Sequence, residues 1–197
     1  MDVKYLLIIL LCIVAIFITL RKCKEGFVVE NITEIVSPAH GKIQAIEKTM
    51  VETNNGPVEY IHIITFLSVF DNHTQTYPCD GVITDQQYDR SGKFHLAFQL
   101  DKSDLNEKVI TEITPSGNRL SLATGGLPII VQRIAGLVAR RITILHDVGT
   151  KVKKLNKQGE ILFGSRVDTI IPAKGAMINV AVGDKVVGAK TVLASYK

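Results

Sequence analysis

The stretch that decides the fold is Gly41-Lys-Ile-Gln-Ala-Ile-Glu-Lys48, with the turn Asn54-Asn-Gly-Pro57 and then Val58-Glu-Tyr-Ile-His-Ile-Ile-Thr-Phe-Leu67. Both runs contain β-branched residues, which suit the pleated backbone of a strand. The asparagines, glycine and proline between them supply the backbone conformations of a tight turn. These pieces together predict two strands separated by a turn.

The same rhythm of short apolar runs and turns continues from Phe27 to the C-terminus. Further candidate strands lie at residues 32–36, 81–83, 94–100, 108–113, 119–123, 142–145, 160–163, 168–171 and 177–180, with turn sequences at 90–93, 115–118 and 157–159. One stretch, 128–140, carries apolar residues at helical spacing and predicts a helix. The chain is therefore expected to be mainly β (α+β), a β-sandwich or barrel-sandwich-like domain with one or two short helices.

Composition restricts the class of function. The 197 residues are 46% hydrophobic and 21% charged, which indicates one folded domain with a short appendage rather than a disordered chain. The net charge of +4 is too small for a dedicated nucleic-acid surface, so no nucleic-acid partner is expected. The three cysteines lack CxxC spacing, and neither a phosphate-binding glycine loop nor a His-Glu-x-x-His pair occurs. Neither a metal nor a nucleotide cofactor is therefore expected.

The apolar residues are concentrated at the N-terminus. Residues 5–20 read Tyr-Leu-Leu-Ile-Ile-Leu-Leu-Cys-Ile-Val-Ala-Ile-Phe-Ile-Thr-Leu, and Arg21-Lys-Cys-Lys24 follows. Such a helix is about 24 Å long, which spans a membrane if the flanking lysines extend to its surface. A buried helix is the alternative. We predict a transmembrane helix, with 1–26 as a membrane anchor and 27–197 as a separate domain on the cytosolic face.

Five ordered stretches carry the most specific signal. They are Val-Ser-Pro-Ala-His-Gly-Lys-Ile at 36–43, Ile-Thr-Phe-Leu-Ser-Val-Phe-Asp-Asn-His-Thr-Gln-Thr-Tyr-Pro-Cys-Asp-Gly-Val-Ile at 64–83, Asp-Lys-Ser-Asp-Leu-Asn-Glu-Lys-Val at 101–109, Gln-Arg-Ile-Ala-Gly-Leu-Val-Ala-Arg-Arg-Ile at 132–142 and Ile-Leu-Phe-Gly-Ser-Arg-Val-Asp-Thr-Ile-Ile-Pro at 161–172. Together they resemble the short-type phosphatidylserine decarboxylases, which are pyruvoyl-dependent enzymes of aminophospholipid synthesis. The resemblance covers nearly all of residues 27–197.

This resemblance implies a zymogen that cuts itself between Gly164 and Ser165. The products would be a β chain of residues 1–164 and an α chain of residues 165–197, with Ser165 converted to the pyruvoyl group. A glycine at 164 suits this cleavage because no side chain shields its carbonyl carbon. The implied reaction converts phosphatidylserine to phosphatidylethanolamine and CO2 through a Schiff base. The implied partners are the phospholipid, the membrane and the two chains of one precursor; an oligomer is compatible with the sequence.

The candidate acid and base residues are histidines. Within Asp71-Asn-His73, an extended backbone would put the carboxylate and the imidazole on one face, so that Asp71 orients His73 or raises its pKa. The resemblance implies that His73 is the proton donor and acceptor in decarboxylation; a surface histidine at a strand end is the alternative. The family's Ser-Pro-Ala-Asp-Gly block has an aspartate where this chain has His40. We predict that His40 acts directly as the base of self-cleavage.

Two further residues are candidates for substrate binding. Arg133 lies within the stretch at 128–140 and would either meet lipid phosphate or belong to the polar face of an amphipathic helix. Phe66 would either form an apolar lip near the site or pack in the core.

A function of another class stays open. The alternative is a membrane-anchored non-catalytic lipid-binding pseudoenzyme or a β-sandwich adaptor. One reason is that His40 replaces the family's aspartate. The other is a pair of similar turns, of the kind found in lipoyl-like sandwiches, at Asp147-Val-Gly-Thr-Lys-Val152 and Val182-Gly-Asp-Lys-Val186. A serine hydrolase has little support, since no Gly-x-Ser-x-Gly elbow surrounds Ser165.

Overall fold

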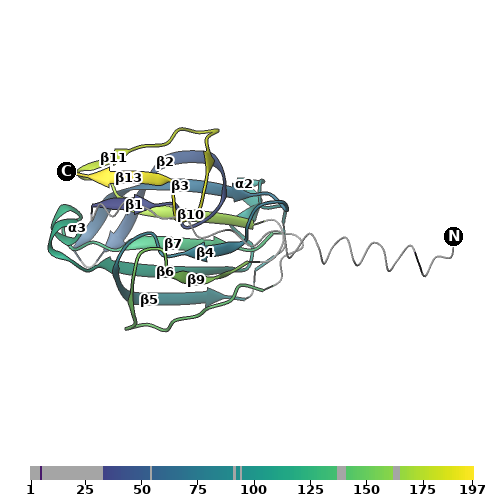
Figure 1. Ribbon diagram of the computed structural model, residues 1–197, viewed down its shortest axis with the longest axis horizontal. Helices are drawn as coiled ribbons and strands as arrows, with labels where there is room; N and C mark the ends of the chain where they lie inside the picture. Colours follow the sequence, from purple (N-terminus) through teal and green to yellow (C-terminus); the bar gives the residue numbers. More distant parts are fainter. Residues whose placement is uncertain are drawn as a thin grey trace.

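A large antiparallel sheet is the frame of the domain in the computed structural model, which describes residues 5, 33–53, 55–90, 92–93, 95–136, 141–161 and 165–197. Its eight strands lie in the order β12-β2-β3-β10-β7-β6-β5-β8. Their bounds are β2 Gly41–Thr53, β3 Gly56–Leu67, β5 Gly81–Asp89, β6 Lys108–Pro115, β7 Ile129–Ile134, β8 Lys151–Val152, β10 Ser165–Pro172 and β12 Lys185–Val186. In Figure 1, β10 lies inside this sheet, between β3 and β7.

Two smaller sheets and two short helices complete the described fold. One sheet has the order β1-β13-β11, and the other pairs β4 with β9. Their bounds are β1 Glu34–Val36, β4 Thr74–Thr76, β9 Lys157–Glu160, β11 Ala176–Ile178 and β13 Val192–Tyr196; the helices are α2 Leu100–Ser103 and α3 Asn118–Ala123. The expectation of a mainly β domain with short helices is confirmed.

One buried core joins the large sheet to the smaller ones. Ile35 of β1 and Leu193 of β13 belong to the same buried cluster as Ile63 of β3 and Val167 of β10. The other face of the large sheet carries a smaller cluster around Tyr60. Strand β10 is buried along its whole length because it has a strand on each side and packed side chains on both faces.

The predicted pair of strands around Asn54-Asn-Gly-Pro57 is present as the hairpin β2–β3. Thr53 pairs with Gly56, and Lys42 at the far end pairs with Phe66, so the hairpin is longer than the two apolar runs. Its outer half includes polar and exposed residues, because only the half nearer Leu67 packs in the main core.

The predicted helix at 128–140 is wrong: β7 occupies Ile129–Ile134, and residues 137–140 lie outside the described part. Strand β7 lies between β10 and β6 and is buried on both faces. A strand buried on both faces is apolar at nearly every position, so its sequence matches helical spacing as well as strand spacing.

Other boundaries also differ from the expectation. Residues 119–123, expected as a strand, lie in helix α3. In the expected strand at 94–100, of which 95–100 are described, Leu100 begins helix α2 and the other described residues form no regular element. The two similar turns at 147–152 and 182–186 lead into the short strands β8 and β12, as expected. The sequence gave no signal for β4 or β13, which are three and five residues long and pair with strands far away in the chain.

The predicted membrane anchor cannot be compared with the structure, because residues 1–26 lie outside the described residues except for Tyr5. Within the described ranges, no helix is long and apolar enough to span a membrane.

Candidate active site

Ser165 is the first residue of β10 and is fully buried. It pairs with Leu67, the last residue of β3. Because side chains alternate along a strand, Ser165 and Val167 face the main core, which includes Val167. Among the described residues, the Ser165 hydroxyl has no hydrogen-bond partner. Gly164, the other half of the predicted cleavage site, lies outside the described residues.

His40 lies at the same end of the sheet as Ser165. Strands β2 and β10 both run antiparallel to β3, so both begin where β3 ends, and His40 directly precedes β2. Gly41 approaches β3 so closely that a Cβ there would lie 2.2 Å from the carbonyl oxygen of Phe66. Two strand spacings separate the starts of β2 and β10, which is about 10 Å.

His73 is buried just before β4, and its ring is held by the main chain. Its Nδ1–H donates to the carbonyl oxygen of Asp71 at 2.7 Å. A carbonyl only accepts, so Nδ1 carries the hydrogen and Nε2 is the basic nitrogen of the neutral ring. The carbonyl of His73 accepts from the amide of Ile161 at 3.1 Å, which ties this segment to the chain four residues before Ser165.

Asp71 contacts His73 differently from the expected arrangement. Residues 68–71 form a turn rather than an extended segment: the carboxylate of Asp71 accepts from the amide of Ser68 at 2.8 Å, and the Asp71 amide donates to the Ser68 carbonyl at 3.0 Å. Aspartate commonly closes such turns with its own side chain. Its backbone carbonyl, not its carboxylate, therefore makes the described contact with the His73 ring.

His40 is half-buried against the C-terminal part of the chain. Its ring lies so close to Gly188 that a Cβ there would be 3.0 Å from the His40 Cδ2 atom. Burial lowers the pKa of His40 from the usual 6.5; the charge of Asp71 opposes this shift, and that of Lys190 adds to it. His40 is therefore mainly neutral at pH 7, the protonation state that a general base requires.

The two candidate substrate-binding residues face opposite sides of the large sheet. Arg133 pairs with Val167 and shares the face of Ser165, where its guanidinium is fully buried. Phe66 pairs with Arg166 and faces the other side, where its ring packs edge-on against Phe98 with the centroids 6.2 Å apart. The fold thus groups Arg133 with Ser165 and separates Phe66 from it.

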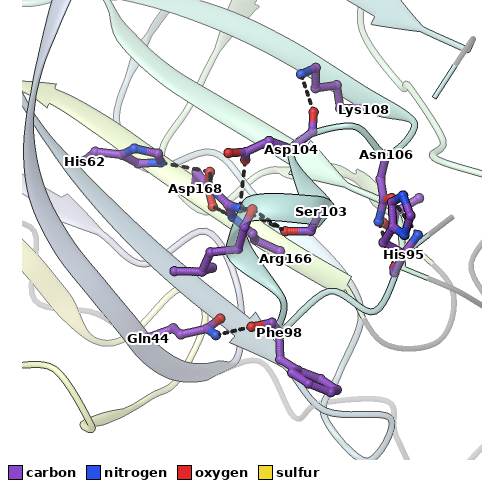
Figure 2. A network of polar contacts seen from close by, with 12 residues as sticks. Gln44, His62, His95, Phe98, Ser103, Asp104, Asn106, Lys108, Arg166 and Asp168 are labelled. Carbon is purple, nitrogen blue, oxygen red and sulfur yellow. Dashed lines mark hydrogen bonds and ion pairs between the residues drawn. The ribbon is translucent and has the colours of Figure 1, made fainter. Parts of the chain in front are cut away.

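Arg166, directly after Ser165, anchors the start of β10 through a buried ion network (Figure 2). Its Nε and Nη2 atoms each donate to Asp168 at 2.7 Å, and Nη1 donates to Asp104 at 2.8 Å and to Ser103 at 3.0 Å. Asp168 also accepts from His62 Nε2 at 2.8 Å. Arg166 and Asp168 are 2% and 0% exposed, so this pair is part of the interior, whereas Asp104 lies at the surface.

Sequence reasoning did not single out Arg166 and Asp168. A signal was present, because an arginine and an aspartate two residues apart in an apolar strand share one face and can pair there. Among the described residues, no cluster of three or more His, Cys, Asp or Glu side chains has metal-binding geometry.

The chain is similar to known phosphatidylserine decarboxylases over most of its length. A family model for phosphatidylserine decarboxylase matches residues 17–194. The phosphatidylserine decarboxylase proenzyme of Neisseria gonorrhoeae (strain NCCP11945) is 36% identical over 167 residues, 84% of this chain and 59% of the relative. The proenzyme of Wolbachia sp. subsp. Brugia malayi (strain TRS) is 37% identical over 164 residues, 82% of this chain and 67% of the relative. That of Rickettsia africae (strain ESF-5) is 36% identical over 165 residues, with the same two shares of 82% and 67%.

The chain spans 59% of the length of its Neisseria gonorrhoeae relatives. No solved structure matches it significantly. The family model nevertheless covers most of the chain, including the histidines at 40 and 73 and the serine at 165. The chain therefore belongs to the phosphatidylserine decarboxylase family.

Proposed function

We propose that the chain is a self-cleaving decarboxylase that converts phosphatidylserine to phosphatidylethanolamine and CO2. The observation that carries this proposal is the Ser165 hydroxyl, which is buried at the start of a central strand and has no hydrogen-bond partner among the described residues. A buried hydroxyl without a partner is uncommon in a folded protein and suggests a functional role. Its neighbours at this end of the sheet are the segments that carry His40 and His73.

Self-cleavage begins with the Ser165 hydroxyl. His40 takes its proton, and the oxygen attacks the carbonyl carbon of Gly164, so that the peptide C–N bond breaks and an ester forms. Loss of the Ser165 α-proton then eliminates the carboxylate of Gly164 and leaves a dehydroalanine. This tautomerises to an imine, and water converts the imine to the ketone of the pyruvoyl group and ammonia. The lowered pKa of His40 supports the first step, because the neutral ring is the form that accepts a proton.

The residues at the start of β10 fit a pyruvoyl group. The hydroxyl that conversion removes makes no hydrogen bond with any described residue, so the change at residue 165 breaks none of those contacts. A pyruvoyl group supplies a carbonyl that condenses with a primary amine and accepts the electron pair when CO2 leaves. Arg166 keeps residue 165 in position after cleavage, because its backbone pairs with two strands and its side chain is held by Asp168 and Asp104.

His73 serves as the proton donor and acceptor at this site. The Asp71 carbonyl holds its Nδ1–H, so Nε2 is the ring nitrogen that would accept or deliver the proton. The link from the His73 carbonyl to Ile161 keeps the ring's segment beside the chain that leads to Ser165. Asp71 is a positioning residue in this proposal, acting through its backbone. Of the two candidate substrate contacts we retain Arg133, since Phe66 faces away from Ser165.

Intact mass of the purified full chain tests the proposal. We expect a fragment of residues 165–197, about one sixth of the 21.6 kDa chain, whose first residue has the mass of pyruvoyl rather than serine. Ser165→Ala is expected to stay uncut. Ser195→Ala, which changes another serine of the same fragment, is expected to cleave like the parent. A parent chain that stays intact after long incubation would contradict the proposal.

Release of labelled CO2 from carboxyl-labelled phosphatidylserine tests the second part of the proposal, the decarboxylation of the lipid. We expect release from the cleaved parent and none from Ser165→Ala. A chain that binds phosphatidylserine vesicles but neither cleaves nor releases CO2 would instead support the non-catalytic pseudoenzyme or adaptor.

We further infer that residues 1–26 anchor a cytosolic domain, residues 27–197, to the membrane, and that this domain is sandwich-like. The apolar run at 5–20 supports the anchor, and the core shared by the large sheet and the β1-β13-β11 sheet supports the layered fold. Each arginine introduced at the centre of a membrane helix costs about 2.5–3.5 kcal/mol. The double variant Leu10→Arg, Ile13→Arg is therefore expected to move the chain from the membrane to the supernatant after alkaline extraction. Retention in the membrane would count against the anchor.

A further inference from the structure

Arg133 is a buried cation for which the described part of the chain provides no anionic partner. It is 0% exposed in the middle of the large sheet. Its Nη1 donates to the carbonyl of Thr143 at 2.7 Å, whereas Nε and Nη2 are buried and make no hydrogen bond with any described residue. None of the ion pairs among the described residues includes Arg133. Burial lowers its pKa to about 10, so the guanidinium still carries its charge at pH 7.

The phenols of Tyr77 and Tyr88 are the groups that act electrostatically on Arg133, but they do not neutralise its charge. Burial raises the pKa of Tyr77 to about 12, and burial together with the hydrogen bond to Glu107 raises that of Tyr88, so both are neutral at pH 7. A buried charge without a partner destabilises a fold strongly. Local features that oppose stability are expected mainly at functional sites.

Arg133 lies beside the reacting residue. Val167 pairs with Arg133 on β7 and with Thr65 on β3, and Ser165 is two residues before Val167 on the same face. Arg133 and Ser165 are therefore diagonal neighbours, about 7–8 Å apart at the backbone. The Thr65 hydroxyl, on the other diagonal, is also buried and has no partner within the described ranges. Three side chains around one position thus have polar atoms with unused hydrogen-bonding capacity.

The small β4–β9 sheet packs against Arg133 and brings a side-chain amide, that of Gln75, to this region. Gly159 of β9 lies against Arg133 so closely that a Cβ there would be 2.2 Å from Nη1. Gln75, which pairs with Gly159, donates to the carbonyl of His73, and its own amide oxygen is buried without a partner among the described residues. The polar groups around Arg133 therefore come from both sheets and lie next to the segment of His73.

We propose that Arg133 binds the carboxylate of the substrate's head group and so selects lipids that carry one; this rests on the proposed function. The substrate offers two anions, a carboxylate and a phosphate. The carboxylate is on the carbon next to the amine that reacts at residue 165, whereas the phosphate carries the tails and must point outward to the membrane. A fully buried arginine one diagonal step from residue 165 matches the nearer anion. The planar guanidinium fork also fits a carboxylate with two parallel hydrogen bonds.

The assignment is tested by measuring how well the matured full chain captures the amine of each lipid at residue 165. Parent, Arg133→Met and the control Arg119→Met, which removes an exposed arginine on α3, are incubated with dihexanoyl phosphatidylserine or dihexanoyl phosphatidylethanolamine. Borohydride then fixes the adducts, and the mass of the α chain reports them. We expect Arg133→Met to lose capture of the serine lipid by about 30-fold, as loss of a charge-assisted contact implies, and to capture the ethanolamine lipid within about twofold of the parent. Arg119→Met should match the parent.

Two results of the capture assay would overturn the proposal. An equal loss with both lipids would show that Arg133 contacts the phosphate or supports the site in general. Unchanged capture of both would show that it contacts no substrate. A parent chain that captures neither lipid contradicts the proposed function instead, and a second measurement then decides the role of Arg133.

That measurement uses the full chain with Ser165→Ala, which needs no maturation. Adding Arg133→Met to it is expected to leave the melting temperature equal or higher, because the change removes an unpaired buried charge. O-phospho-L-serine should raise the melting temperature more than O-phosphoethanolamine does, and the difference should vanish with Arg133→Met. A fall of several degrees on adding Arg133→Met, or equal shifts with the two probes, would refute a carboxylate-binding role.

Discussion

Replacing Asp168 by asparagine removes the carboxylate that pairs with Arg166 while keeping the size of the side chain. Asp168 accepts two hydrogen bonds from Arg166 and one from His62, all between 2.7 and 2.8 Å, and is 0% exposed. Breaking a buried pair by removing one partner costs about 3–5 kcal/mol. Asp104 still contacts Arg166 in the variant, so we expect the lower end, about 3 kcal/mol.

Thermal unfolding followed by circular dichroism measures this cost. The comparison is made in the Ser165→Ala chain, so that cut and uncut molecules are not mixed. For a chain of this length the melting temperature should fall by about 6–12 °C. The matched control is Asp104→Asn, which removes the other carboxylate of Arg166, 60% exposed, and should lower the melting temperature by less than about 4 °C. Equal shifts for the two variants would refute the view that the buried pair anchors β10.

Three further predictions concern the site and its frame. His73→Gln is expected to leave self-cleavage intact but to slow CO2 release at least about 100-fold, since it removes the proposed acid and base; equal activity would contradict that role. Self-cleavage, followed by intact mass from pH 4.5 to 8, should slow only below pH 6.5, because the pKa of His40 is lowered and the ring protonates below that value. His40→Asp should move this loss toward the carboxyl range near pH 4, and an identical profile would exclude His40 as the base. Gly159→Ala should lower the melting temperature by several degrees, since its Cβ would lie 2.1 Å from the Thr143 carbonyl oxygen and 2.2 Å from Arg133 Nη1; an unchanged value would mean that β9 shifts freely.

Local sequence was a good guide where one face of a strand is buried or where a turn is chemically marked. The β2–β3 hairpin around Asn54-Asn-Gly-Pro57 is the clearest example. The sequence was a poor guide at β7, where both faces are buried and the apolar spacing also suits a helix. It was poor again at α3, a helix of six residues that includes Ser121 and Leu122 and was expected to be a strand. Short elements such as α3 depend on tertiary contacts more than on intrinsic propensity.

The candidate site was likewise predicted only in part from the sequence. Ser165, His73 and His40 were predicted as candidates from their motifs, because the proposed chemistry depends on residue type and order. The turn that redirects the carboxylate of Asp71 to Ser68 was not foreseen, since an extended backbone and a turn are both compatible with Asp-Asn-His. The Arg166–Asp168 pair was also missed, because an arginine and an aspartate in a strand become a buried network only when partners such as Ser103 and Asp104 pack over them.

The sequence by itself determined the mainly β character of the domain, the resemblance to phosphatidylserine decarboxylases and the serine at which cleavage is proposed. Only the tertiary structure decided which side chains share a face with that serine. It grouped Arg133 with Ser165, turned Phe66 to the opposite side and brought the segments of His40 and His73 to the end of the sheet where β10 begins. The physical reason is that strand register joins residues far apart in the chain, and a shift of one residue would reverse every one of these faces.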